Sequence, residues 1–205
     1  MVLHNFIVFE GIDGAGTSTQ LAILKNKIPT KKAFFSAEPT TNETGKFLRR
    51  ILSGEIPVHP KTAAYLFAAD RCEHIYGKDG IQEKASSGIL CFSDRYFFSS
   101  LAYQSQECGA ELPKMLNSNF PLPEILFYFT IDPSVSLKRI IGRETTEIYE
   151  KEDFLRKTER AYKAIMQDFR EKAPEMKIIE IDATLPVDKV SEIIDSTLKQ
   201  QGLIS

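Results

Sequence analysis

The chain has 205 residues, of which 42% are hydrophobic and 26% charged, and its formal net charge is −2 at pH 7. This length suits one well-packed core and is short for two full domains. A near-neutral charge disfavours a protein that binds nucleic acid mainly through the phosphate backbone, since such proteins carry a basic excess. We therefore expect one globular domain over residues 1–205, with no nucleic acid as its partner.

The cysteines and the N-terminus bear on location. Cys72, Cys91 and Cys108 form no C-x-x-C pair, and the three histidines show no zinc-ligand spacing. The N-terminus has no signal-type apolar core, and no apolar run approaches the ~20 residues of a membrane span. We expect reduced thiols, no structural metal, no membrane partner and a cytoplasmic location.

Short apolar runs alternate with longer amphipathic segments along the chain. Apolar runs of strand length occupy residues 6–9, 33–35, 89–92, 125–131 and 178–181. Apolar residues with helical spacing occupy residues 21–28, 47–52, 154–169 and 187–198. Because each crossover is too long for a hairpin, the pattern predicts an α/β fold with a parallel five-stranded sheet flanked by helices. Ligands of such sheets bind at the carboxyl ends of the strands.

A glycine-rich segment follows the first predicted strand and opens the first predicted helix. Its glycine offset is that of a P-loop, G-x-x-x-x-G-K-[ST], in which backbone N–H groups and a helix N-terminus bind phosphate. Ser18 stands where a hydroxyl holds Mg²⁺. The alternative is an ordinary glycine-rich turn. The residues expected to bind phosphate are Gly11, Ile12, Asp13, Gly14, Ala15, Gly16, Thr17, Ser18 and Thr19.

One position departs from the P-loop pattern, because Thr17 stands where lysine normally reaches the β- and γ-phosphates. Threonine carries no charge, so the loop lacks its usual cation during phosphoryl transfer. Either another cation compensates for the lysine or catalysis is impaired.

A charged pair, Asp94 and Arg95, follows the third predicted strand. Opposite a P-loop, Asp94 can hold Mg²⁺ or its waters and Arg95 can clamp a phosphate. The alternative is a surface ion pair at a helix start, where aspartate is a common N-cap.

Two further helix faces carry polar and aromatic residues. Ser100, Tyr103 and Gln104 share one face, and Phe67 and Arg71 share another. An aromatic ring with an arginine one turn away can stack on a nucleobase and hydrogen-bond to it. The alternative is that Phe67 is a core residue and Arg71 is solvated.

Together these segments resemble the thymidylate kinase family of nucleoside monophosphate kinases. The resemblance spans nearly the whole chain and rests on residues 9–16, 38–39, 45–52, 66–71 and 94–104. The last two stretches are specific, whereas a P-loop marks only the superfamily. The resemblance implies a P-loop NTPase-type fold with a small lid, phosphorylation of dTMP to dTDP with ATP and Mg²⁺, and a homodimer.

The resemblance also implies roles at the acceptor site. Phe67 would stack on thymine, with Arg71 and Ser100 on its polar edge, while Arg49 and Arg95 would hold the acceptor phosphate. The residues expected to bind dTMP are Glu38, Arg49, Phe67, Arg71, Arg95, Ser99, Ser100, Tyr103, Gln104 and Tyr162.

Three of the implied roles concern the sugar. Tyr103 would lie against it and leave no room for a ribose 2′-hydroxyl. Asp13 would lie near the 3′-hydroxyl and the acceptor phosphate, and Tyr162 matches a family tyrosine close to the sugar.

On the donor side, Asp182, Ala183 and Thr184 would pass beside adenine, next to Arg139. The lid would span approximately residues 138–151. Because the P-loop itself contains no arginine, the branch of the family in which lid arginines assist transfer is the better match. Arg143 would then stabilise the transition state and offset Thr17; the alternative is a solvated basic helix end. The expected catalytic residues are Asp13, Asp94, Arg95 and Arg143, and the expected Mg²⁺ ligands are Ser18 and Asp94.

Two other functions remain open from the residues. The acceptor can be dUMP, another nucleotide or a deoxynucleoside, although Arg49 and Arg95 favour an acceptor that already carries phosphate. Thr17 also allows a nucleotide-binding protein with weakened catalysis.

Overall fold

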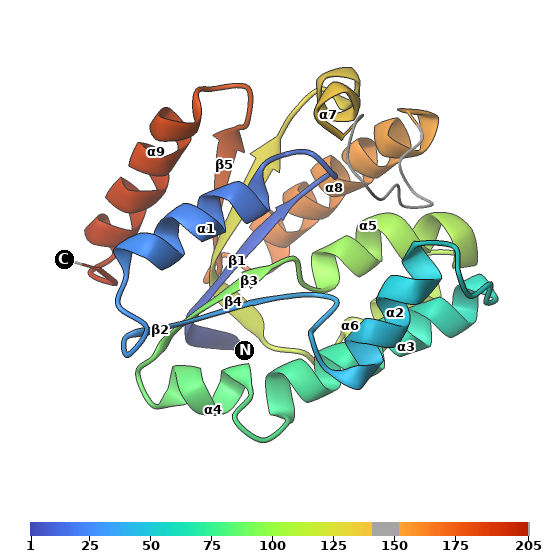
Figure 1. Ribbon diagram of the computed structural model, residues 1–205, viewed down its shortest axis with the longest axis horizontal. Coiled ribbons are helices and arrows are strands. Elements are labelled where there is room, and N and C mark those ends of the chain that lie inside the picture. Colours follow the sequence, from blue (N-terminus) through green and yellow to red (C-terminus); the bar gives the residue numbers. More distant parts are fainter. Residues whose placement is uncertain (141–151, 205) are drawn as a thin grey trace.

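A computed structural model describes residues 1–140 and 152–204. Its centre is a parallel sheet in the order β2-β3-β1-β4-β5 (Figure 1). The strands are β1 Val2–Gly11, β2 Ala33–Ala37, β3 Leu90–Asp94, β4 Leu122–Thr130 and β5 Lys177–Asp182. The prediction of five parallel strands is confirmed.

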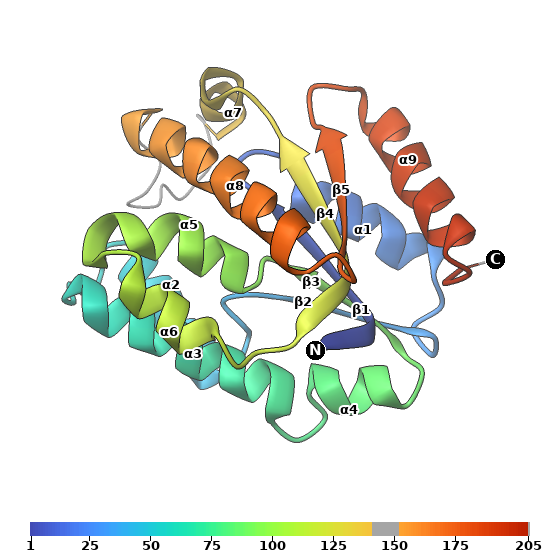
Figure 2. The ribbon, with the colours of Figure 1, turned by 180° about the vertical axis from the view of Figure 1, so that it is seen from behind.

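Helices cover both faces of the sheet. In the described residues they are α1 Thr17–Lys27, α2 Glu43–Leu52, α3 Pro60–Tyr76, α4 Ile81–Ser86, α5 Phe97–Cys108, α6 Glu111–Asn117, α7 Pro133–Ile140, α8 Glu152–Lys172 and α9 Val187–Gln200. Helices α1 and α9 lie on one face, and α5 and α8 on the other (Figure 2). Helices α2, α3 and α6 gather beside α5.

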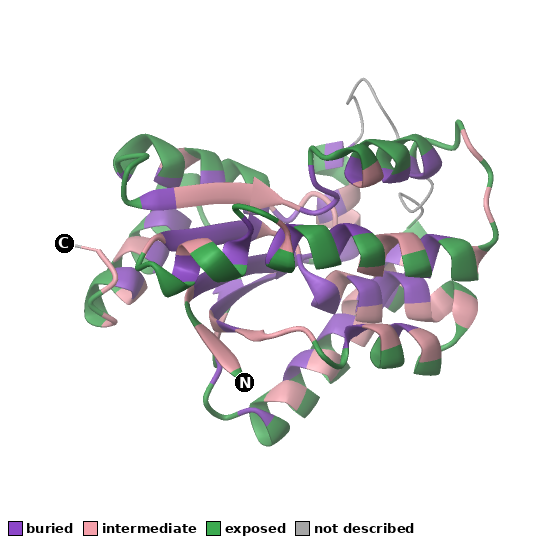
Figure 3. Cartoon of the chain, turned by 90° about the horizontal axis from the view of Figure 1, so that it is seen from below, coloured by how far each residue is buried: buried purple, intermediate pink, exposed green. Residues whose placement is uncertain are grey.

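The central strands supply the middle of the core. Residues 6–9 of β1 and 125–127 of β4 are fully buried, because helices cover both faces of the sheet. Figure 3 shows this buried layer between helices whose outer faces are exposed. None of the described helices combines the length and apolar character needed to cross a membrane.

The strand order brings distant parts of the sequence to one edge of the sheet. All five strands are parallel, so their carboxyl ends lie at the same edge. The glycine-rich loop follows β1, residues 38–39 follow β2, residues 94–95 end β3, and residues 182–184 end β5. The parallel sheet therefore gathers most of the segments that the sequence indicates.

Candidate active site

A cavity of ≈ 330 Å³ lies at the carboxyl ends of β1, β2 and β3. It combines the glycine-rich loop with residues from α2, α3 and α5. Its lining residues are Ile12, Asp13, Gly14, Gly16, Thr17, Ser18, Thr19, Ala37, Glu38, Pro39, Arg49, Leu52, Phe67, Arg71, Asp94, Arg95, Tyr96, Ser99, Tyr103 and Gln104. Most of the residues predicted for phosphate and acceptor binding thus share one cavity.

The glycine-rich loop has the conformation that its glycines allow. Gly14 and Gly16 have φ values of 80° and 96°, which strain any residue with a side chain. A Cβ atom at Gly14 would also lie 2.8 Å from the carbonyl oxygen of Ser136 on α7. Helix α1 starts at Thr17 without a side-chain cap and without acidic residues in its first turn. Its first N–H groups are therefore available to an anion.

Ser18 and Asp94 form the candidate magnesium site. The hydroxyl of Ser18 donates to Oδ2 of Asp94. Oδ1 of Asp94 is buried and has no hydrogen-bond partner within the described residues. Hydroxyl and carboxylate oxygens are ligands that Mg²⁺ prefers, and the unpaired oxygen can accept a bond from a water of the ion. The residues present therefore fit the ion.

Arg95 is fixed at both its backbone and its side chain. It has a φ of 72°, and its N–H donates to the carbonyl of Phe9 at 2.9 Å. Its Nη1 donates to the carbonyl of Gly11 at 3.0 Å and to Oγ of Ser99 at 3.2 Å, and its Nη2 donates to Asp13. A cation held in this way beside the loop is suited to binding a second phosphate.

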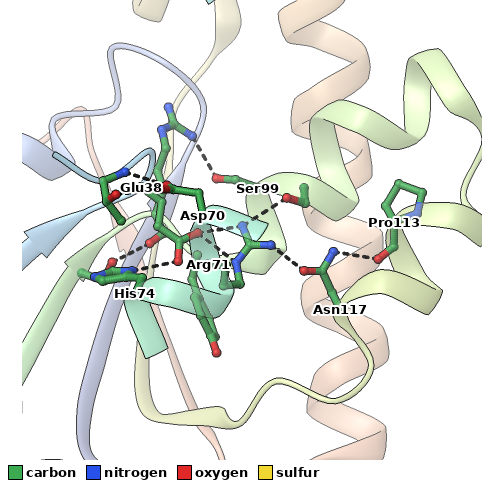
Figure 4. A network of polar contacts seen from close by, with 12 residues as sticks. Glu38, Asp70, Arg71, His74, Ser99, Pro113 and Asn117 are labelled. Carbon is green, nitrogen blue, oxygen red and sulfur yellow. Dashed lines mark hydrogen bonds and ion pairs between the residues drawn. The ribbon is translucent and has the colours of Figure 1, made fainter. Parts of the chain in front are cut away.

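Arg71 lies in a network of polar contacts (Figure 4). Its side chain is only 1% exposed. Its Nε donates to Oε2 of Glu38 at 2.9 Å, its Nη1 to Asn117, and its Nη2 to Oγ of Ser100 at 3.2 Å. The interpretation of Arg71 as a solvated residue is therefore wrong, because a carboxylate and two neutral acceptors compensate its burial. Ser100 is held through Arg71 and does not line the cavity.

Arg49 reaches the same cavity from α2. Its Nη2 donates to the carbonyl oxygen of Pro39, which follows β2. Gln104 lines the cavity from α5 and is buried. Both residues lie where the sequence predicted acceptor contacts.

The predicted adenine residues lie outside this cavity, at the neighbouring edge of the loop. Nη2 of Arg139 donates to the carbonyl of Ala183 at 2.9 Å, and its Nη1 lies 3.5 Å from the carbonyl of Gly14. Oδ1 of Asp182 accepts from the N–H of Thr184 at 2.9 Å and from its hydroxyl at 2.6 Å. Arg139 thus joins the loop to the turn after β5. Arg143 and most of the predicted lid lie outside the described residues.

Glu10, at the end of β1, is a buried charged residue that the sequence analysis missed. Burial raises the pKa of its carboxyl group from 4.5 to about 7, against the opposing effects of the Arg95 charge and of the hydrogen bonds it accepts. The hydroxyls of Ser99 and Tyr162 each donate to it at 2.7 Å. Tyr162, which was predicted to bind the acceptor, bonds to Glu10 and is not among the residues that line the cavity. The available signal was an acidic residue directly after the apolar run Phe6–Phe9.

Comparisons with known proteins identify the family of the chain. A family model described as "Thymidylate kinase" matches residues 9–194. The chain is 42% identical to a "Putative thymidylate kinase" of Treponema pallidum (strain Nichols) over 97% of both chains. It is also 42% identical to a "Probable thymidylate kinase" of Methanocaldococcus jannaschii over 82% of this chain and 85% of that protein.

A solved structure gives the same result for the fold. The structure of thymidylate kinase from Candida albicans matches with a TM-score of 0.79 at 24% identity, over 98% of this chain and 93% of that chain. This match confirms the predicted architecture. With a family model that matches residues 9–194 and a relative 42% identical over 97% of both chains, the chain belongs to the thymidylate kinase family.

Proposed function

We propose that the cavity at the ends of β1, β2 and β3 is where this thymidylate kinase phosphorylates dTMP to dTDP with ATP. The observation that carries the proposal is that one cavity combines the N-terminus of α1 with Arg49, Arg95 and the pocket beside Phe67. The loop and the helix end suit the phosphates of the donor. The two arginines suit the phosphate of the acceptor, and the aromatic pocket suits its base.

Phosphoryl transfer requires mainly positioning and charge stabilisation from the protein. An oxygen of the acceptor phosphate attacks the γ-phosphorus in line, while the bond from that phosphorus to the β,γ-bridging oxygen breaks and ADP leaves. Arg95, which Asp13, Gly11 and Ser99 hold in place, would orient that phosphate and stabilise developing charge. Ser18 and Asp94 would hold Mg²⁺, which supplies charge neutralisation on the donor phosphates when bound.

The base and sugar contacts define acceptor selectivity. Phe67 would stack on thymine, with Arg71 and Gln104 toward its polar edge. Ser100 would act through the hydrogen bond that it accepts from Arg71. Tyr103 would exclude a 2′-hydroxyl, because its ring is fixed when its hydroxyl donates to Oδ2 of Asp13 at 3.0 Å. Glu38 and Ser99 would act through the two arginines that they bind, Arg71 and Arg95.

The missing loop lysine requires another source of positive charge. Arg95 donates to the carbonyl of Gly11 and Arg139 to the carbonyl of Gly14, so both arginines contact the loop. Arg143 is the third candidate, and its role rests on the family resemblance. Arg139 and residues 182–184 would lie beside adenine. We propose that these arginines together offset Thr17.

The assembly is proposed to be a homodimer of a single kinase domain over residues 1–205, with the lid at approximately 138–151. Exposed apolar side chains support a dimer, because Phe47, Tyr65 and Met115 lie on α2, α3 and α6 and are 37%, 54% and 60% exposed. Contacts between α3 and the other two helices place these residues on one helical layer. The free cysteines of the described residues suit a cytoplasmic location.

A substrate panel tests the proposal. The purified protein is assayed for ATP-dependent conversion of dTMP, dUMP, dCMP, dGMP and AMP, together with a Thr17→Lys variant. We expect selective turnover of dTMP by the wild-type protein and no large gain from Thr17→Lys. A silent wild-type protein that becomes active with Thr17→Lys would instead indicate a nucleotide-binding protein with degenerate catalysis. Selective turnover of a different acceptor would contradict the assignment of the base pocket.

A further inference from the structure

The side chain of Glu10 accepts four hydrogen bonds that play no part in the pairing of the strands. Oε1 accepts from the backbone N–H groups of Tyr96 at 2.8 Å and Ser99 at 3.2 Å. Oε2 accepts from the hydroxyls of Ser99 and Tyr162, both at 2.7 Å. The residue is 0% exposed. Burying a carboxylate costs free energy, and four donors hold this one in a single orientation.

A single hydroxyl connects this carboxylate to Arg95. Oγ of Ser99 donates its hydrogen to Glu10 and accepts from Nη1 of Arg95 at 3.2 Å. The backbone of Arg95 is also bound to β1, because its N–H donates to the carbonyl of Phe9, the neighbour of Glu10. The end of β1 therefore fixes Arg95 at its backbone and through its side chain.

Titratable groups from several elements surround Glu10. The titratable groups of the surrounding elements are Asp13 of the loop, Arg95 and Tyr96 between β3 and α5, Tyr103 of α5, Tyr128 of β4 and Tyr162 of α8. Arg95 is the cation of this set. Burial raises the pKa of Tyr96, Tyr103 and Tyr162 well above its usual value, so these hydroxyls stay neutral.

We propose that Glu10 is a positioning residue of the acceptor site, whose ionised carboxylate acts through Ser99 to orient the guanidinium of Arg95. This inference rests on the proposed role of Arg95 in binding the acceptor phosphate. When Glu10 is ionised, the Ser99 hydrogen points to the carboxylate and an oxygen lone pair faces Arg95. When Glu10 is protonated, its own hydrogen competes for Ser99 Oγ, and the contact to Arg95 weakens.

The burial of Glu10 places this change near neutral pH, since its pKa is raised to about 7. Ionisation occurs above that pH, so the affinity for dTMP falls as the pH decreases through it. The second ionisation of the dTMP phosphate falls in a similar range, near pH 6 for phosphate monoesters. The test must therefore separate the protein group from the substrate.

The substitution Glu10→Gln provides this separation. Glutamine keeps an acceptor for the two backbone N–H groups and donates toward Ser99 at every pH, as the protonated acid does. Wild type and variant are compared by kcat/KM for dTMP from pH 6 to pH 8.5, and the substrate ionisation cancels in the ratio. We expect the ratio to rise from near one to about tenfold across pH 7, the size of one weakened charge-assisted hydrogen bond. The effect appears in KM for dTMP, with KM for ATP unchanged.

Glu124→Gln is the matched control. Glu124 lies on β4 toward the opposite edge of the sheet, where its Oε2 accepts from the N–H of Asn5 at 2.7 Å. The ratio of kcat/KM for dTMP between wild type and Glu124→Gln should stay near one at every pH. A flat ratio for Glu10→Gln would overturn the proposal, even if that variant were less stable, and so would equal rises in KM for both substrates.

Two further variants complete the test. If Glu10→Gln does not fold, Ser99→Ala interrupts the same connection while leaving the carboxylate in place, and a pH-independent ratio for it overturns the inference. Arg95→Ala distinguishes the proposed acceptor site from the proposed role of Glu10. Activity retained by Arg95→Ala contradicts the proposed acceptor site, whereas loss in Arg95→Ala with a flat Glu10→Gln ratio contradicts only the role of Glu10.

Discussion

Breaking the buried pair between Glu38 and Arg71 by removing one partner should strongly lower both stability and acceptor binding. Oε2 of Glu38 accepts from Nε of Arg71 at 2.9 Å and lies 2.7 Å from its Nη2, and the two side chains are 4% and 1% exposed. Glu38→Ala removes the carboxylate and leaves the guanidinium with Asn117 and Ser100, which are neutral. An uncompensated buried charge costs about 3–5 kcal/mol.

Thermal unfolding followed by circular dichroism measures this cost. For a chain of this size, 1 kcal/mol corresponds to roughly 2–4 °C, so Glu38→Ala should lower Tm by about 10 °C. The variant should also raise KM for dTMP, because Arg71 loses its orientation. Glu55→Ala is the control, since it removes the exposed pair with Arg50 and should leave Tm unchanged.

A double substitution identifies the cause of the loss. Glu38→Ala combined with Arg71→Met removes both charges, and an apolar side chain then fills the space beside Tyr96. Stability should recover in large part relative to Glu38→Ala, because the unpaired charge is gone. A Tm for Glu38→Ala within about 2 °C of wild type would refute the reasoning, because it corresponds to less than about 1 kcal/mol.

Two further substitutions test other parts of the structure. The Glu10 pKa is raised on folding from 4.5 to about 7, so the free energy of unfolding of the wild type falls as the pH rises across this range. Urea unfolding of the wild type and of Glu10→Gln should show that the wild type loses about 3 kcal/mol relative to the variant between pH 4 and pH 8. A difference that stays constant with pH would contradict the assignment. Gly14→Ala should abolish ATP binding measured by calorimetry, because its Cβ would meet the carbonyl of Ser136 at 2.8 Å. Gly88→Ala, at a φ of 86° with no atom within 4 Å of its Cβ, should lose stability only.

The sheet was predictable because helices cover it on both faces. Strands buried in this way read as continuous apolar runs, as residues 6–9 and 125–131 do. The first four residues of β1, residues 2–5, were not predicted. Val2 and Leu3 pair with Leu122 and Pro123 of β4, and the register shifts between Leu3 and Ile7. Such pairing leaves no side-chain pattern in the sequence.

Three short helices were also missed, α4, α6 and the eight-residue α7. Helix α4 has six residues and α6 has seven, and α6 contains Pro113. Neither is long enough to show an apolar stripe over two turns. Their formation depends on packing against β1 and β3 for α4, and against α3 and α5 for α6.

The site was predictable where its residues follow strands and not where they meet across helices. Parallel strands place the glycine-rich loop beside residues 94–95, and this arrangement follows from sequence order alone. The partners of Arg71 do not follow from sequence order, because Glu38 and Asn117 are 33 and 46 residues away and reach it through tertiary packing. The two interpretations of Arg71 could be separated only by its burial.

The most direct test of the acceptor site compares Arg95→Ala with Lys199→Ala in steady-state conversion of dTMP to dTDP. Arg95 lines the cavity and is bound to Asp13, whereas Lys199 lies near the end of α9, away from the cavity. We predict that Arg95→Ala lowers kcat/KM for dTMP by about 100-fold or more, as expected for a group that stabilises transferring charge. Lys199→Ala should stay within about twofold of wild type. Comparable activity of the two variants would contradict the assignment of the active site.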